Sequence, residues 1–111
     1  ENGVAKISGG QVNKNCFTCP TFTNPDKTGT VKVRANGIAI GEYIYVACGG
    51  YGLVVLDKSK AKGENVVARR RAFYDGKESY NSANYVTLYQ DYICVAYGRS
   101  RVQIFKLANI K

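Results

Sequence analysis

The sequence predicts an all-β protein built from two copies of one repeat. Nine Tyr and four Phe, together with many Val and Ile, favour strands, and twelve Gly can supply tight turns. Two segments of the chain also align with each other at a constant offset of 49 residues, as between Tyr43 and Tyr92. Each segment contains two short apolar runs joined by a turn that contains Gly, which is the pattern of a β-hairpin.

The repeat covers residues 41–57 in the first copy and residues 90–106 in the second. Glu42 opens the first copy and Asp91 opens the second. A period of this length is typical of β-propeller blades rather than of small helical repeats. We therefore expect a first blade over residues 31–73 and a second blade over residues 74–111. The identical positions are Tyr43, Ile44, Val46, Ala47 and Gly49, matched by Tyr92, Ile93, Val95, Ala96 and Gly98.

Each copy predicts a hairpin with strands on either side. In the turns, Gly can adopt the positive φ that a tight hairpin requires. A strand is expected before each hairpin, and a further strand after the first one only, so the second blade is truncated by one strand. The expected strands are 33–40, 42–48, 53–56 and 65–73 in the first copy and 84–89, 91–97 and 102–107 in the second, with turns at 49–52 and 98–101.

The first hairpin strand is apolar on both faces. Tyr43, Tyr45 and Ala47 share one face, and Ile44, Val46 and Cys48 share the other. Such a sheet is expected to be covered on both sides. Two blades alone would leave apolar faces in water, because propellers usually contain about four to eight blades. We therefore expect a homo-oligomer that closes a ring, or the remainder of a longer propeller.

The N-terminal third has a different composition. Residues 4–7 predict a short strand, and residues 13–30, rich in Asn and Thr with both Pro residues, predict a long loop. Cys16 and Cys19 form a C-x-x-C motif inside this loop. Pro20 follows directly, which is typical of a loop. In a redox site the C-x-x-C motif begins a helix instead. A local disulfide or two free thiols are expected.

The chain contains no His, so a Ser-His-Asp or Cys-His catalytic arrangement is excluded. A zinc site would need all four cysteines, including Cys48 and Cys94 from the apolar strands. No nucleotide-binding glycine motif occurs, and the eight acidic residues show no obvious catalytic pair. The sequence therefore predicts no catalytic residue, no metal site and no cofactor.

The net charge of +8 is compatible with an acidic partner. No nucleic-acid-binding motif accompanies it, so we expect a protein or an acidic glycan rather than a nucleic acid. The one basic cluster, Arg69 to Arg71, is interpreted as a charged edge that prevents an outer strand from pairing with another chain. No apolar run approaches the roughly 20 residues needed to span a membrane.

In a propeller, the hairpin turns and the links between blades lie on one face. That face would gather a ligand-binding set of Arg and Tyr side chains, suited to an acidic or planar partner through hydrogen bonds and stacking. The alternative is that Arg99 and Arg101 are solvated turn residues that bind no ligand. The predicted ligand-binding residues are Tyr51, Tyr74, Tyr80, Arg99 and Arg101.

The segment from Tyr43 to Asp57 resembles the LVIVD-type repeat of bacterial β-propellers. Those repeats run from an aromatic-x-aromatic-Val-Ala strand through a Gly-rich turn to a Gly-Leu and a Val/Ile-rich strand that ends in Asp. The second copy departs from this pattern, because Arg101 replaces the Gly before the last strand and Lys106 replaces the closing Asp. The resemblance covers roughly a third of the chain and implies a secreted or cell-surface protein.

The chain contains no Met, which we interpret as processing or excision from a larger parent. The favoured hypothesis is a non-enzymatic propeller module that binds a protein or a glycan outside the cytoplasm. The alternative is a fragment of a propeller enzyme whose active site lies in absent blades. A lectin built on Tyr platforms is a third reading.

Overall fold

The computed structural model describes residues 3–8, 11–18, 21–23, 30–32, 34–60, 63–74, 77–79 and 81–109. Nearly all regular structure in these residues is antiparallel strand, so the predicted all-β class is confirmed there. Two short 3-10 turns accompany the strands, η1 (Gly98–Ser100) and η2 (Leu107–Asn109). None of the described residues belongs to a helix with the length and apolar character needed to cross a membrane.

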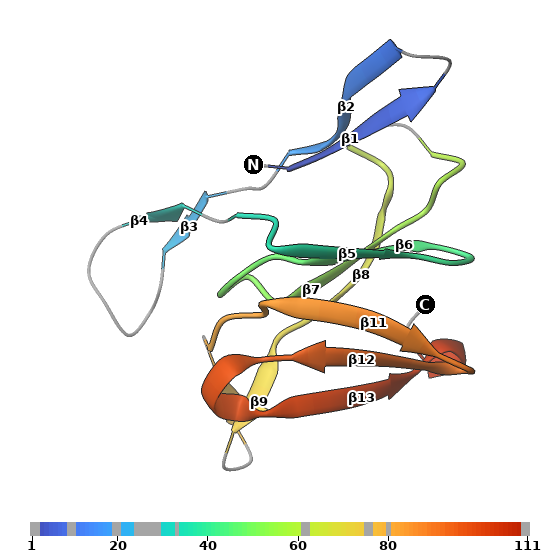
Figure 1. Cartoon of the computed structure of the whole chain (residues 1–111). Helices are drawn as coiled ribbons and strands as arrows, with labels where there is room; N and C mark the ends of the chain where they lie inside the picture. Colours follow the sequence, from blue (N-terminus) through green and yellow to red (C-terminus); the bar gives the residue numbers. More distant parts are fainter. Residues whose placement is uncertain are drawn as a thin grey trace.

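The first sheet contains four strands in the order in which the chain makes them (Figure 1). The strand predicted over 53–56 has those bounds, whereas the one predicted over 33–40 begins only at Gly37. The strand predicted over 65–73 is wrong as one element, because it divides at Arg71 into β8 and β9 (Ala72–Tyr74). β9 pairs with β10 (Lys77–Ser79) instead. The four strands are β5 (Gly37–Ile40), β6 (Ile44–Ala47), β7 (Leu53–Leu56) and β8 (Val66–Arg70).

The second sheet has three strands, β11 (Tyr85–Tyr89), β12 (Tyr92–Ala96) and β13 (Val102–Lys106), again in chain order. Its register repeats that of the first sheet. Ile44 pairs with Leu56 in one sheet and Ile93 pairs with Phe105 in the other, so both partners move by the same 49 residues. The sequence repeat is therefore also a structural repeat.

The loop that joins the first two strands of each sheet differs in length by one residue between the two sheets. Three residues, 41–43, join β5 to β6, whereas Gln90 and Asp91 alone join β11 to β12, with Gln90 at a φ of 52°. As a result Gly37, which pairs with Ala47, corresponds to Tyr85, which pairs with Ala96. The first strand of each sheet thus aligns at an offset one residue shorter than the rest.

The two sheets pack face to face, with β5 next to β11 (Figure 1). The apolar core between them is formed by one face of β6 and β7 and by the inward face of the second sheet. Burial of apolar surface is the main favourable term here, at about 25 cal/mol per Å² removed from water. The side chains buried in this core include Tyr45, Ala47, Leu53, Val55, Val86, Ile93, Val95 and Tyr97.

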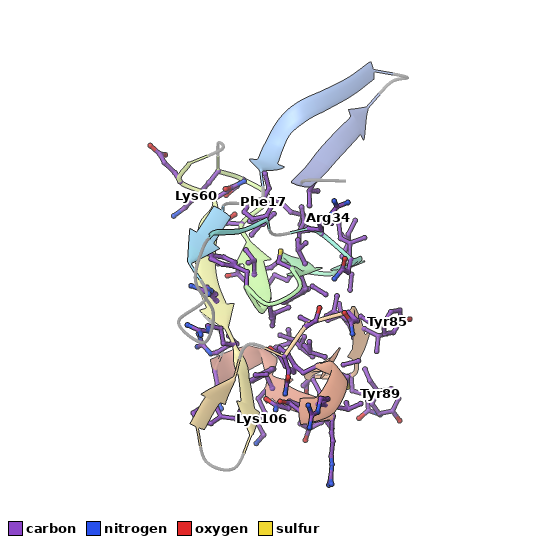
Figure 2. The ribbon with its side chains drawn as sticks, turned by 90° about the vertical axis from the view of Figure 1, so that its left-hand side faces the viewer. Phe17, Arg34, Lys60, Tyr85, Tyr89 and Lys106 are labelled. Carbon is purple, nitrogen blue, oxygen red and sulfur yellow. The ribbon has the colours of Figure 1, made fainter. Side chains whose placement is uncertain are left out.

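The opposite face of the first sheet is also covered. Phe17, on β2 (Gln11–Thr18), is 7% exposed and packs on Val46 and Val54, with Val4 of β1 (Gly3–Ser8) alongside. Figure 2 shows Phe17 between the β1–β2 hairpin and this sheet. The expectation that both faces of the first sheet are covered is confirmed, and β6 and β7 are almost completely buried as a result.

The prediction of a long loop over residues 13–30 is wrong. β2 extends to Thr18, and β3 (Thr21–Thr23) pairs with β4 (Thr30–Lys32). The Asn and Thr content suggested turns, but Thr is β-branched and favours strands when a partner strand and an apolar surface are available. Burial of Phe17 supplies that surface.

Candidate functional site

Two hairpin turns lie at one end of the sheets, and we call this end, formed by residues 49–52, 81–84 and 98–101, the turn end. The first turn is closed by hydrogen bonds from the Gly52 N–H to the Gly49 carbonyl and from the Cys48 N–H to the Gly52 carbonyl. Gly52 has a φ of 94°, and a Cβ there would overlap the backbone carbonyl of Arg70. This position accepts only glycine without rearrangement.

The second turn contains η1 and ends at Arg101. Arg101 is one repeat beyond Gly52 and retains a positive φ, at φ 68° and ψ −163°. This backbone region is populated almost only by glycine, and a non-glycine residue held there costs about 1–3 kcal/mol. The guanidinium groups of Arg101 and Arg99 are both exposed at this turn.

Segment 81–84, which precedes the first strand of the second sheet, is hydrogen-bonded to both turns. Ala83 exchanges two backbone hydrogen bonds with Gly49, at 3.0 and 2.8 Å, and its carbonyl also accepts from the Asn36 side chain. Two residues earlier, the Asn81 amide donates to the hydroxyl of Ser100 in η1 at 2.6 Å. Segment 81–84 therefore holds the two turns in a fixed relation.

The structure brings together only some of the predicted ligand-binding residues. Arg99 and Arg101 lie in the same turn, separated by the buried Ser100. Tyr51 lies in the other turn, but its ring packs with the cluster around Phe17, on the side of the first sheet that faces away from the second sheet. For Tyr74 only the backbone, in β9 next to η1, is described. Tyr80 lies outside the described residues.

The sequence did not identify Arg69 as the partner of Tyr51. The Arg69 guanidinium lies 3.5 Å from the centre of the Tyr51 ring, and its Nε donates to the Tyr51 carbonyl at 2.8 Å. A cation–π pair of this kind contributes roughly 0.5–1 kcal/mol at a partly exposed site. One face of the tyrosine ring is therefore already occupied. Of the Arg69–Arg71 run, Arg69 and Arg70 lie on the edge strand β8, and Arg69 already makes contacts within the protein.

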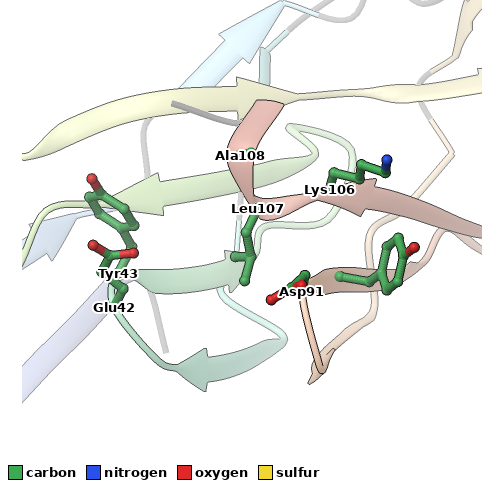
Figure 3. Close-up of a pocket in the computed structure, with 7 residues that line it drawn as sticks. Glu42, Tyr43, Asp91, Lys106, Leu107 and Ala108 are labelled. Atoms are coloured by element: carbon green, nitrogen blue, oxygen red, sulfur yellow. The ribbon is translucent and has the colours of Figure 1, made fainter.

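A pocket of about 510 Å³ lies at the opposite end of the sheets. Glu42 and Asp91, which are equivalent positions of the two repeats, both line it. Figure 3 shows Glu42 and Tyr43 on one side, Asp91 on the other and Leu107 between them. The Leu107 N–H donates to the Asp91 carbonyl, which brings the end of β13 to this site. The two carboxylates can accept hydrogen bonds or attract a cation. Their offset of 49 residues in the sequence is the feature that could have predicted their place at the same end of the two sheets.

The described part of the chain contains no group of three or more acidic, Cys or His side chains that could hold a metal ion. Cys48 is buried on the Phe17 side of the first sheet, Cys94 lies on the second sheet, and neither of these two described cysteines is in a disulfide. The side chain of Cys16 and the whole of Cys19 lie outside the described residues.

Comparison of the whole chain with protein-family models, with curated proteins and with solved structures gives no match.

Proposed function

We propose that this chain is a non-enzymatic binding module of the β-propeller type, and that its turn end recognises carboxylate or sulfate groups of an acidic protein or glycan. The observation that carries the proposal is the backbone of Arg101. An arginine at a position that favours glycine lowers stability, so its retention there calls for another role. The side chains of Arg101 and Arg99 are both exposed in the same turn, and each can donate charge-assisted hydrogen bonds.

The blade assignment is part of the same proposal. Two antiparallel sheets of equal register, stacked face to face with their first strands adjacent, are the arrangement that neighbouring blades require. The sequence resemblance to LVIVD-type repeats supports this assignment and, with it, a location outside the cytoplasm. The net charge of +8 favours an acidic partner over a basic one.

The test is binding of two acidic probes, a heparin-derived hexasaccharide and a hexaglutamate peptide, measured by isothermal titration calorimetry at low salt. We expect Arg101→Ala to weaken binding of the preferred probe by about 10-fold or more, since one hydrogen bond to a charged group contributes about 1.5–3 kcal/mol. Lys60→Ala is the matched control, because Lys60 is exposed in the loop after β7, and β7 runs from the 49–52 turn to the opposite end of the first sheet.

Both variants remove one positive charge, so they separate a local contact from a general effect of charge. Equal weakening by Lys60→Ala and Arg101→Ala would contradict the proposal, as would failure of both probes to bind. The preferred probe decides between a glycan and a protein partner. Binding that falls steeply as salt is added is expected in either case.

A further inference from the structure

The two hairpin turns have the same backbone conformation at their first glycine, but only one of these glycines is covered. Gly49 and Gly98, which are equivalent positions 49 residues apart, both have a φ of 57°. The Gly52 N–H donates to the Gly49 carbonyl in the first turn, and the Arg101 N–H donates in the same way in the second. Gly49 is buried, whereas Gly98 is exposed. The difference therefore lies in what packs on each turn.

Gly49 is covered by the segment that leads into the second sheet. We call the residues just before the first strand of each repeat, 34–36 and 82–84, the link segments. Ala83 of the second link segment exchanges two backbone hydrogen bonds with Gly49 and also accepts from the Asn36 side-chain amide at 3.2 Å. Ala83 is fully buried there. Gly49 and Asn36 thus form a docking site that holds one residue of the chain by three hydrogen bonds.

The second repeat carries the same groups in the same places. Asn84 corresponds to Asn36, because the N–H of each donates to the last residue of the second strand in its own sheet. A Cβ built on Gly49 would lie 3.7 Å from the Asn36 Nδ2. One built on Gly98 would lie 3.8 Å from the Asn84 Nδ2. The side-chain donor is therefore held at the same place beside the glycine in both repeats.

The groups that hold Ala83 in the first repeat have no such partner in the second. Within the described part of the chain, neither the Gly98 N–H nor the Asn84 Nδ2 donates a hydrogen bond. The Gly98 carbonyl accepts from Arg101 and retains a second lone pair, which its counterpart Gly49 uses for Ala83. Backbone donors and acceptors at fixed positions are the means by which proteins bind extended peptide segments.

We propose that Gly98 and Asn84 form a second, preformed docking site for an extended peptide segment, and that its occupant is the link segment of a further repeat. The central residue of that segment exchanges two backbone hydrogen bonds with Gly98, and its carbonyl accepts a third from Asn84. This residue is small, because Ala83 is fully buried at the corresponding place. Both link segments of this chain carry Ala-Asn there, at 35–36 and 83–84, which favours this kind of segment over an unrelated peptide.

The affinity of the site for an isolated link segment is expected to be low. Each hydrogen bond replaces one made to water, so its net contribution is small, and a short peptide also loses conformational entropy when it is ordered. A dissociation constant on the order of 1 mM is expected. In a folded repeat the same contacts act at a higher effective concentration, because the rest of the structure presents the segment.

The test is an NMR titration of the isotope-labelled chain with the acetylated and amidated peptide Asn-Ser-Ala-Asn-Tyr, which has the sequence of residues 81–85. We expect a saturable shift of the Gly98 amide. The Gly49 amide is an internal control and should not shift, because Ala83 of the same chain already occupies that site. The same peptide with Ala83→Pro lacks the central N–H and should not bind.

Two asparagine variants test the side-chain contact. Asn84→Ala removes the donor and should weaken peptide binding by about 5-fold. Asn36→Ala is the matched control, because it removes the same side chain from the equivalent site and should leave binding at Gly98 unchanged. The inference rests on the repeat and on backbone groups, not on the acidic ligand proposed for Arg101. Arg101→Ala should therefore leave peptide binding unchanged, so the two proposals can fail separately.

Three results would overturn the proposal. The first is the absence of a saturable Gly98 shift at peptide concentrations up to about 20 mM, well above the expected dissociation constant. The second is equal binding of the peptide that carries Ala83→Pro. The third is equal weakening of peptide binding by Asn84→Ala and Asn36→Ala.

Discussion

The hydroxyl of Tyr97 donates a hydrogen bond of 2.7 Å to the backbone carbonyl of Arg70. Tyr97 follows β12 in the second sheet and Arg70 ends β8 in the first, so this bond joins the edge of one sheet to the centre of the other. Tyr97 is also fully buried in the shared core. The contact therefore combines apolar burial with satisfaction of a backbone acceptor.

Replacing Tyr97 by Phe removes this bond and keeps the ring. The carbonyl of Arg70 loses this hydrogen bond, and we expect the free energy of unfolding to fall by about 1–2 kcal/mol. Urea unfolding followed by fluorescence measures this change. Tyr89→Phe is the control, because that hydroxyl lies on a side chain that is 64% exposed, and a change within about 0.5 kcal/mol is expected. Equal effects of the two variants would show that the Tyr97 bond contributes little.

The same tyrosine predicts a dependence of stability on alkaline pH. Burial raises the pKa of Tyr97 well above its ordinary value of 10.0, although a backbone hydrogen bond from Leu53 and the charge of Arg70 lower it in part. Below pH 10 the phenol is neutral in both the folded and the unfolded chain. Above pH 10 the unfolded chain releases a proton that the folded chain keeps, so stability falls as pH rises, by up to about 1.4 kcal/mol per pH unit.

The check is unfolding free energy at pH 9 and pH 11 for the original chain and for Tyr97→Phe. The variant should lose less stability between these two pH values. Some loss will remain, because burial and the charge of Glu42 also raise the pKa of Tyr45. An identical loss in both proteins would mean that Tyr97 ionises normally in the folded state.

Arg101→Gly is expected to stabilise the protein. Relief of the unfavourable backbone conformation contributes about 1–3 kcal/mol, and the added freedom of glycine in the unfolded chain removes about 0.4–1 kcal/mol of that. We expect a net gain of about 1 kcal/mol in urea unfolding. Arg99→Gly is the matched control and should give no gain, because the only positive φ values of non-glycine residues in the described chain are at Arg101 and Gln90.

Gly52 and Gly63 form a natural pair for separating backbone conformation from close packing. Their φ values are 94° and 93°, but a Cβ on Gly63 meets nothing within 4 Å, whereas a Cβ on Gly52 overlaps the Arg70 backbone. Gly63→Ala should therefore cost about 1 kcal/mol, and Gly52→Ala roughly 1–3 kcal/mol more. Thermal unfolding of both variants measures the difference. Similar costs would show that the first turn can move away from β8.

The repeat made much of the fold predictable. Apolar runs of four or five residues between Gly-containing turns located β7, β12 and β13 to within a residue, because hairpin chemistry is local. The strands of residues 13–30 were missed, since β2 depends on burying Phe17 against a sheet that lies far along the chain. Long-range pairing of this kind leaves little trace in a Thr- and Asn-rich segment.

The candidate site was only partly predictable for a similar reason. The hairpin pattern correctly placed Arg99 and Arg101 in one turn. Sequence could not show that Tyr51 turns to the other side of the first sheet, because a four-residue turn can direct its third side chain to either face. The alignment of the repeats showed that Arg101 stands where the first copy has Gly52. Only the backbone angles show that Arg101 adopts a conformation that favours glycine.

The fastening of segment 81–84 to both turns has a mechanical consequence. Displacement of either turn strains the hydrogen bonds Gly49–Ala83 and Asn81–Ser100, which connect it through segment 81–84 to the other sheet. The two repeats should consequently melt together in one cooperative transition, with no half-folded chain accumulating on the way.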